Sequence, residues 1–367
     1  MKILHISSAK TWRGGEQQIA YLVEELQKLK IAQHIFCAKD SSIEAWCVAQ
    51  GIEYTTYLKA SSISPFTAKK LADTINKQNC QILHAHDSHA HTYACIAMRL
   101  FACKVPIVLH RRVDFLIKKS PLSKWKYNDI AIAKIICVSA AIQRILATSI
   151  RDKTKLNVVH SGIDKSRFQF ESTEVLRKEF GVPNSHLLIG NVAAIAAHKD
   201  YFTFVDTVEI LVREGLNATF FIIGGDGGEK AAIQEHITKK SLKDYIFFTD
   251  FRTDIPRILP ELDVFLFTSK EEGLGTSVLD AFAAKVPVVA TNAGGIPEMV
   301  QHEKTGLLAK VGDAKQLAKN VKRIVKQHDL AKQLTQNASA RLEDFTKQKM
   351  ASQILEIYQE IMSDLRL

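Results

Sequence analysis

The chain has 367 residues, of which 46% are hydrophobic and 24% are charged, and its formal net charge is +10. This composition excludes disordered and collagen-like proteins, and the length predicts two or three domains. No apolar run approaches the roughly 20 residues of a membrane-spanning helix, and residues 1–8 have the pattern of a first strand rather than of a signal peptide. We therefore expect a cytoplasmic protein. Its charge leaves anionic membranes, nucleic acids and anionic small molecules open as partners.

Strand-like and helical patterns alternate along both halves of the chain, which predicts parallel sheets with crossover helices. In the first half the expected strands are 3–6, 34–38, 82–84, 106–109, 135–138 and 156–159, and the expected helices are 16–29 and 43–50. In the second half the expected strands are 187–192, 219–223, 246–248, 264–267 and 286–290, followed by helices at 313–326, 329–341 and 346–365. The polar stretch 161–183 separates two doubly wound α/β halves.

The most informative segment is 271–300, EEGLGTSVLDAFAAKVPVVATNAGGIPEMV. Gly273 and Gly275 occupy a turn between a buried strand and a helix expected at 276–284. The free backbone N–H groups at such a helix start, aided by the helix dipole, favour a phosphate. The segment therefore predicts an anion site.

Two acidic residues, Glu272 and Asp280, accompany this anion site. A phosphate would repel them, so we interpret them as acceptors for hydroxyl groups. For an isolated pair, ordinary solvated acids would be the better interpretation, but a second turn and helix start follow at Gly294 and Gly295. A ligand with both phosphates and hydroxyls is a nucleotide sugar.

With these residues the segment resembles the glutamate motif of retaining GT-B glycosyltransferases of family 4, the glycosyl transferases group 1. In that family the first acid contacts the transferred sugar and the second the ribose, which implies these roles for Glu272 and for Asp280, a shorter acid than the usual Glu. The resemblance implies a GT-B fold, with two Rossmann-like doubly wound domains facing a central cleft. The acceptor-side domain would be 1–165 with the C-terminal helix 346–367, and the nucleotide-sugar domain 166–345.

The resemblance also makes Lys199 the lysine that binds the donor diphosphate. The family usually has an arginine five residues earlier, where this chain has Ala194. One of two cationic contacts is therefore missing. Arg111, Arg112 and His198 are the candidates to replace it.

The remaining donor contacts are expected in glycine-rich turns after strands. A dinucleotide-binding interpretation fails, because neither Gly14 nor Gly224 opens a G-x-G-x-x-G run with an acid about 20 residues later. The residues implied to bind the donor are Gly14, Gly15, Gly224, Gly225, Arg252, Gly273, Leu274, Gly275, Thr276, Ser277 and Asp280.

Four histidines lie in the run 84–91, which raises a metal hypothesis. Asp87 is one residue early for the H-x-H-x-D-H pattern of metallo-hydrolases, and no second ligand cluster follows, so we expect no metal. The resemblance instead makes His86 the histidine near the transferred sugar, as a hydrogen-bond donor. Together with Glu272 and Lys199 it completes the expected catalytic set.

Arginines and a basic, aromatic segment mark the first half. Arg111 and Arg112 end a strand and suit an anionic acceptor or the donor phosphates. The segment 115–134 then mixes lysines with apolar side chains, which fits either an anionic membrane surface or an ordinary solvated helix face. Its lysines are Lys118, Lys119, Lys124, Lys126 and Lys134.

We therefore expect a retaining, metal-independent hexosyltransferase without a cofactor, which moves a sugar from a UDP- or GDP-sugar to a saccharide or lipid-linked acceptor in cell-surface polysaccharide, lipopolysaccharide or glycolipid synthesis. It would be cytoplasmic, with a peripheral contact to the inner face of the membrane as one interpretation. Two alternatives stay open: a non-catalytic nucleotide-sugar-binding protein and a non-hydrolysing sugar-nucleotide epimerase. Nucleic acid is not expected as a partner, because no base-reading motif accompanies the basic residues.

Overall fold

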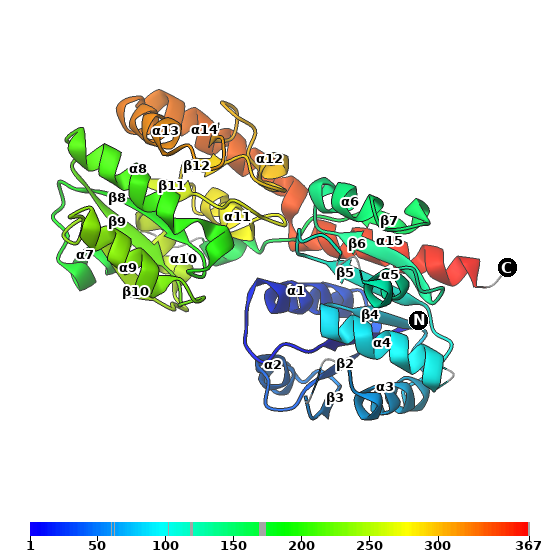
Figure 1. Ribbon diagram of the computed structural model, residues 1–367. Helices are drawn as coiled ribbons and strands as arrows, with labels where there is room; N and C mark the ends of the chain where they lie inside the picture. Colours follow the sequence, from blue (N-terminus) through cyan, green and yellow to red (C-terminus); the bar gives the residue numbers. More distant parts are fainter. Residues whose placement is uncertain (60, 62, 102, 118–119, 169–173, 366–367) are drawn as a thin grey trace. The chain divides into compact units, whose positions relative to one another are not determined.

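The computed structural model describes residues 1–367 except 60, 62, 102, 118–119, 169–173 and 366–367. The chain divides into two compact units, Met1–Gly162 with Lys347–Leu367 (unit 1) and Ile163–Thr346 (unit 2) (Figure 1). The sequence placed these boundaries at 165 and 346. The chain therefore leaves unit 1 after Gly162 and returns to it at Lys347, so the last helix belongs to unit 1.

In its described residues, unit 1 contains a seven-stranded parallel sheet of order β3-β2-β1-β4-β5-β6-β7. The strands are β1 Lys2–Ser7, β2 Ala32–Ala38, β3 Tyr54–Tyr57, β4 Ile82–Ala85, β5 Ile107–Arg111, β6 Ile132–Cys137 and β7 Leu156–Val158. The order reverses between β1 and β4, which pair from Ile3 with Ile82 to Ile6 with Ala85. At such a reversal the loops after the two strands turn to opposite faces and leave a crevice.

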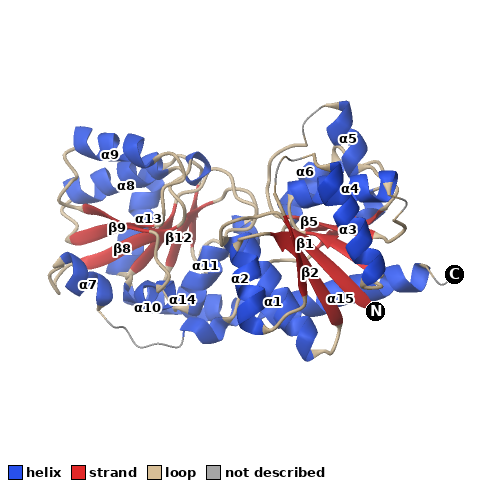
Figure 2. Cartoon of the chain, turned by 90° about the horizontal axis from the view of Figure 1, so that it is seen from below, coloured by secondary structure: helices blue, strands red, loops and turns tan. Residues whose placement is uncertain are grey.

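Helices cover both faces of this sheet (Figure 2). They are α1 Gly14–Lys28, α2 Ser42–Gln50, α3 Pro65–Lys77, α4 Ser88–Leu100, α5 Pro121–Tyr127, α6 Ala140–Ala147 and α15 Lys347–Asp364. Side-chain caps fix several starts; Asp87, for example, accepts from the backbone N–H groups of His89 and Ala90. The apolar face of α15 packs through Ile354 and Tyr358 onto α1 and the central strands.

Unit 2 has, within the residues described, a six-stranded parallel sheet of order β10-β9-β8-β11-β12-β13. The strands are β8 Leu187–Val192, β9 Ala218–Ile223, β10 Ile246–Asp250, β11 Val264–Phe267, β12 Val288–Thr291 and β13 Leu307–Ala309. Its order reverses between β8 and β11. The helices are α7 Val175–Phe180, α8 Tyr201–Arg213, α9 Lys230–Lys239, α10 Ile255–Ile258, α11 Thr276–Ala283, α12 Ile296–Met299, α13 Ala314–Lys326 and α14 His328–Arg341.

The expected α/β class with two doubly wound units is confirmed. Sequence patterns missed β3 and β13, which form sheet edges and are only four and three residues long. A strand expected at 286–290 begins at Val288, after Pro287, which has no N–H to give to a ladder. Along the described part of the chain, no helix is both long and apolar enough to span a membrane.

Four buried histidines lie together on one face of the central strands of unit 1 and are called the imidazole array: His5, His84, His86 and His110. Arg112 donates through Nη2 to Nδ1 of His86 and of His110, both at 3.3 Å. A guanidinium only donates, so both Nδ1 atoms accept, and His86 carries its proton on Nε2. That Nε2–H donates to His5 Nδ1 at 3.0 Å, and His5 Nε2–H donates to Gln33 Oε1 at 3.1 Å. The donor and acceptor roles in these hydrogen bonds therefore fix the neutral tautomers of His86 and His5.

Burial keeps these imidazoles uncharged. Desolvation lowers the pKa of His5 to about 4, and it lowers the pKa values of His84, His86 and His110 well below their ordinary value, with further lowering from the charge of Arg112. Nδ1 of His84 lies 2.5 Å from the Tyr358 hydroxyl, so α15 contributes to the same array. Arg112 has its own pKa lowered to about 10 by burial, partly offset by the charges of Glu16 and Asp87.

The array predicts acid sensitivity of unit 1. Folded His5, His84, His86 and His110 stay neutral, whereas in the unfolded chain they take up protons near pH 6.5. Stability is therefore fully present above about pH 6.5 and falls as the pH drops towards 4, by up to about 1.4 kcal/mol per pH unit for each histidine. The three tryptophans, Trp12, Trp46 and Trp125, all lie in unit 1, so urea unfolding followed by tryptophan fluorescence from pH 7 to pH 5 measures this slope.

His84→Gln should reduce the slope by about one proton, whatever it does to absolute stability. His89→Gln is the matched control, because His89 is a half-buried residue at the start of α4 outside the array. A slope that is the same in wild type and His84→Gln would contradict the neutral array.

Candidate functional site

The candidate site of unit 2 lies where its strand order reverses. The loop after β8 carries Lys199 and the loop after β11 carries Glu272, and hydrogen bonds join the two loops. Lys270 N–H donates to the His198 carbonyl at 2.9 Å, and the Thr268 hydroxyl donates to the Lys199 carbonyl at 3.2 Å. Ligands of open parallel sheets bind at this place. The fold therefore brings together two residues that are 73 positions apart.

Lys199 and Glu272 form an ion pair between Lys199 Nζ and Glu272 Oε2. Both side chains are largely shielded, with 14% and 13% exposed. The Ser269 hydroxyl also donates to Glu272 Oε2 at 3.3 Å, and Lys199 Nζ lies 5.2 Å from the centre of the Phe267 ring. The residue expected to bind the phosphates and the residue expected to bind the sugar are thus paired with each other.

Glycines fix the backbone of Glu272. Gly294 has φ +49°, and a Cβ there would lie 1.9 Å from the Glu272 carbonyl oxygen, which accepts from Gly295 N–H at 3.0 Å. Gly275 has φ +90°, and its Cβ would lie 3.1 Å from Glu272 Cγ. Side chains at either position would push Glu272 aside. The glycines of this motif therefore position Glu272 as well as shaping an anion site.

The first turn of α11 has the features of an anion site. Its N-cap is Gly275, which has no side chain to cap the first amides, and the helix spans eight residues from Thr276. Leu274 is buried and anchors the turn, while Gly273 and Ser277 flank the helix start. A phosphate at this end would meet N–H groups and the positive end of the dipole.

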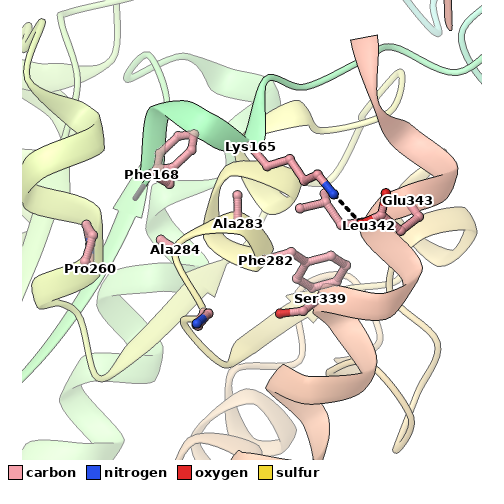
Figure 3. Close-up of a pocket in the computed structure, with 10 residues that line it drawn as sticks. Lys165, Phe168, Pro260, Phe282, Ala283, Ala284, Ser339, Leu342 and Glu343 are labelled. Carbon is pink, nitrogen blue, oxygen red and sulfur yellow. Dashed lines mark hydrogen bonds and ion pairs between the residues drawn. The ribbon is translucent and has the colours of Figure 1, made fainter. Parts of the chain in front are cut away.

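Asp280, one turn into α11, has an unusual charge state. Burial raises its pKa to about 7, and the charge of Arg167 opposes this in part. Asp280 therefore takes up a proton at a higher pH than an ordinary aspartate. The far end of the same helix borders a cavity of about 500 Å³, and Lys165 and Glu343, which line one side of it, form an ion pair (Figure 3). Lys199 and Glu272 do not line that cavity.

The other donor candidates of unit 2 follow β9 and β10. Gly224 has φ +156°, and a Cβ there would lie 2.0 Å from the Ala193 carbonyl oxygen, so the loop carrying Ala194 runs against it. Gly225 accepts from Ile195 N–H at 2.9 Å in the same contact. Arg252 is engaged elsewhere: it donates to Asp254 Oδ1 at 2.8 Å and to Glu179 Oε2 at 2.7 Å.

The candidates of unit 1 lie at its own order reversal, between β1 and β4. Gly14 and Gly15 begin α1, and a Cβ at Gly15 would lie 3.9 Å from Arg112 Cδ, so this helix start lies beside the buried guanidinium. His86 is 6% exposed, and both of its ring nitrogens have partners within unit 1. Its expected donor role therefore requires a rearrangement of the array. Arg111 donates to the Tyr127 hydroxyl at 2.8 Å, away from this array.

The histidines that lie close enough together to bind a metal ion are not the four of the run 84–91 on which the metal hypothesis is based. His5, His84 and His86 each place one ring nitrogen within 4.8 Å of the others, whereas His91 binds the Lys126 carbonyl at 3.1 Å. A cation here would face the charge of Arg112 in a desolvated site, which is costly. The geometry favours the neutral hydrogen-bonded array over a metal site.

The sequence motifs did not reveal the hydrogen-bonded side chains around Arg112, in which His110 accepts from Arg112, and His5 and Gln33 continue from His86. His5 and His110 sit inside strands and look like ordinary core residues, and Gln33 carries no motif. One signal was available: His84, His86 and His110 alternate along neighbouring strands, which puts them on one face. Strand order alone could have shown that His5 joins them.

In the segment 115–134, Lys126 and Lys134 are half-buried and have partners on neighbouring helices. Lys126 Nζ donates to the Ser88 carbonyl and the Thr92 hydroxyl, both at 3.1 Å, and Lys134 forms an ion pair with Glu360. The ammonium groups of these two lysines thus have partners within unit 1, and the membrane contact expected for the segment stays a prediction. Lys124 lines a groove of about 1020 Å³ with Arg151 and exposed apolar residues. Lys118 and Lys119 lie outside the described residues.

Each unit matches a family model of glycosyltransferases. Residues 12–167 match the family described as Glycosyltransferase Family 4, and residues 172–341 match Glycosyl transferases group 1. Among curated relatives, the N-acetyl-alpha-D-glucosaminyl L-malate synthase of Bacillus anthracis is 26% identical over 304 residues, 81% of this chain and 79% of that protein. The UDP-Gal:alpha-D-GlcNAc-diphosphoundecaprenol alpha-1,3-galactosyltransferase of Escherichia coli is 26% identical over 252 residues, 65% of each chain.

Solved structures share the fold. Anabaena HepE in complex with UDP and glucose has a TM-score of 0.86 at 20% identity, covering 98% of this chain and 100% of that one. A glycosyltransferase from Rickettsia africae has the same score at 22% identity, covering 98% of both. The family resemblance and the GT-B fold expected from the motifs are confirmed. The chain therefore belongs to the group 1 glycosyltransferases, enzymes of the GT-B fold.

Proposed function

We propose that this enzyme transfers a hexose from a nucleotide-sugar donor to an acceptor hydroxyl with retention of anomeric configuration, in the synthesis of a cell-surface polysaccharide, lipopolysaccharide or glycolipid. The observation that carries the proposal is the meeting of Lys199 and Glu272 at the order reversal of unit 2, beside the uncapped start of α11. A cation and helix-start amides suit a diphosphate, and a carboxylate suits sugar hydroxyls.

In the proposed reaction the protein mainly stabilises charge. Lys199 and the first amides of α11 neutralise the diphosphate as its bond to the anomeric carbon breaks. Glu272 accepts hydrogen bonds from the sugar and fixes its orientation. The acceptor hydroxyl attacks the same face that the diphosphate leaves, and its proton passes to the departing phosphate oxygen. No metal or cofactor takes part in this proposal.

The donor and acceptor classes rest on the relatives. HepE has been solved with UDP and with UDP-glucose, which supports a uridine nucleotide over GDP as the first donor to test. The Escherichia coli relative is named for a lipid-linked sugar acceptor, which supports a saccharide or lipid-linked acceptor here. A small anionic acceptor is the second candidate, because Arg112 is a buried cation beside the Gly14–Gly15 helix start.

Two other functions are compatible with the same fold. Ala194 and Asp280 depart from the family pattern, which would suit a non-catalytic nucleotide-sugar-binding protein. An epimerase would change the donor without any acceptor. The family membership of both units favours transfer over these two alternatives.

The donor assignment predicts selective stabilisation by one nucleotide. A ligand that binds only the folded state raises the melting temperature, so UDP, GDP, ADP and CMP, with and without their common sugars, can be compared. One of them should raise the melting temperature, and Lys199→Ala should remove this shift. With that donor and a crude acceptor pool, Lys199→Ala and Glu272→Ala should lower transfer at least about a hundredfold, the scale of losing one group that stabilises charge in the transition state.

Lys270→Ala is the matched control, because Lys270 is an exposed neighbour whose backbone, not its side chain, joins the two loops. Wild-type rates in Lys199→Ala or Glu272→Ala would remove these residues from the site. Turnover of the donor without an acceptor would identify the epimerase.

The proposed ribose contact of Asp280 predicts pH-dependent donor affinity. A carboxylate accepts hydrogen bonds from both ribose hydroxyls, and Asp280 is mostly protonated below its pKa of about 7. Affinity for UDP-glucose should therefore rise by up to about tenfold from pH 6 to pH 8, a range in which its diphosphate does not titrate. Calorimetric titration of wild type and Asp280→Asn checks this, since the variant should show a flat profile. A flat profile in wild type would exclude this contact.

We also propose a membrane contact through the groove of unit 1 beside α5. Leu116, Leu122 and Trp125 are 69%, 60% and 43% exposed, and Lys124 and Arg151 line the groove. Apolar side chains with neighbouring cations suit an anionic lipid surface, at about 1 kcal/mol for each basic residue.

Replacing Lys124 and Arg151 with Glu should release the protein from anionic liposomes in a flotation assay. Lys70→Glu with Lys77→Glu on α3 changes the charge equally at exposed positions elsewhere in unit 1, and should leave binding unchanged. Equal partitioning of both double variants and wild type would make the groove an ordinary surface.

A further inference from the structure

The strongest unassigned feature is the ion pair between the two residues that the donor is proposed to use. Within the described part of the chain, Glu272 is the one carboxylate that forms an ion pair with Lys199. The pair is largely shielded from water, so it keeps more of its attraction than an exposed surface pair would. Any anion that binds Lys199 must compete with Glu272.

The backbones of both residues are held independently of this pair. Lys199 N–H donates to the Ala196 carbonyl at 2.9 Å, and the Lys199 carbonyl accepts from Thr268. The Glu272 carbonyl accepts from Gly295 N–H, with Gly294 packed against it. Exchange of partners therefore needs only rotation of two long side chains, which is fast compared with backbone rearrangement.

Ala194 limits the cations that the loop after β8 can offer to a diphosphate. Because residue 194 is alanine, residues 193–200 of the loop after β8 offer one lysine, Lys199, and no arginine to a diphosphate, beside the amides of α11. A diphosphate that takes Lys199 leaves the Glu272 carboxylate shielded and without its cation. An unpaired shielded carboxylate is costly, and this cost disappears when sugar hydroxyls donate to it.

We propose that Glu272 competes with the nucleoside diphosphate for Lys199. It releases Lys199 more readily when the sugar of the donor supplies hydroxyl groups to its carboxylate, and it displaces the diphosphate product from Lys199 after transfer. This inference rests on the proposed function. It gives the site a preference for nucleotide sugar over free nucleoside diphosphate. Once the sugar has moved to the acceptor, Glu272 loses its hydroxyl partners and returns to Lys199.

The test compares UDP with UDP-glucose by calorimetric titration of wild type and Glu272→Gln. The glutamine keeps the shape of the side chain but removes the charge that competes for Lys199. UDP should bind Glu272→Gln at least about threefold more tightly than it binds wild type, the scale of one partly shielded ion pair. UDP-glucose should bind the variant no more tightly than wild type. Product inhibition by UDP should strengthen by the same factor as its affinity.

Glu271→Gln is the matched control, because it removes the same charge from the neighbouring exposed residue, and it should leave UDP affinity unchanged. In Glu272→Gln with Lys199→Gln the gain should vanish. UDP affinity that is unchanged or weaker in Glu272→Gln would overturn the competitor role, while UDP-glucose binding remains as evidence for the proposed function. If neither ligand, nor any nucleotide of the melting-temperature screen, binds wild type or Glu272→Gln, both proposals fail.

Discussion

In each sheet the strand order reverses once, between β1 and β4 in unit 1 and between β8 and β11 in unit 2. This reversal is the constraint on which the rest of the molecule depends. In both units the strands run parallel, so all their carboxyl ends meet at one edge, and connecting helices that leave to opposite faces cannot cover the point of reversal. In unit 2 that point receives Lys199 and Glu272. In unit 1 it receives the Gly14–Gly15 helix start and His86. The topology thus determines where each site lies, and the motifs determine which side chains it contains.

The central parts of this architecture follow from sequence pattern, and its edges do not. Residues of β9 and β11 are buried on both faces, so they form nearly continuous apolar runs that predict strands directly. In contrast, the short edge strand β3 is half-buried, and its residues Tyr54 to Tyr57 give no comparable signal. Strand existence was therefore easier to predict than the number of strands in each sheet.

The candidate site divides in the same way. Glu272, Asp280 and the glycines between them are close in sequence, so a motif carries them. Arg112 donates to His86 and His110, and His86 connects through His5 to Gln33. These residues come from β1, β2, β5 and the position after β4, and no local pattern joins them. Their relation appears only when the order of the strands is known. The same holds for the pairing of Lys199 with Glu272, because a motif indicates which ligand group a residue binds but not which side chain it pairs with.

The two units hold their cations differently, and this bears on how a dianionic donor would be handled. Arg112 is surrounded by neutral imidazoles that only accept its hydrogen bonds, with Glu16 and Asp87 as more distant counter-charges, so its position is fixed. Lys199 is held by one carboxylate on a flexible side chain and is therefore exchangeable. The net charge of +10 attracts an anionic donor at long range, while the pair at Lys199 is locally neutral. Long-range attraction favours arrival of any nucleotide, so discrimination between substrate and product has to come from the short-range exchange of partners at Lys199.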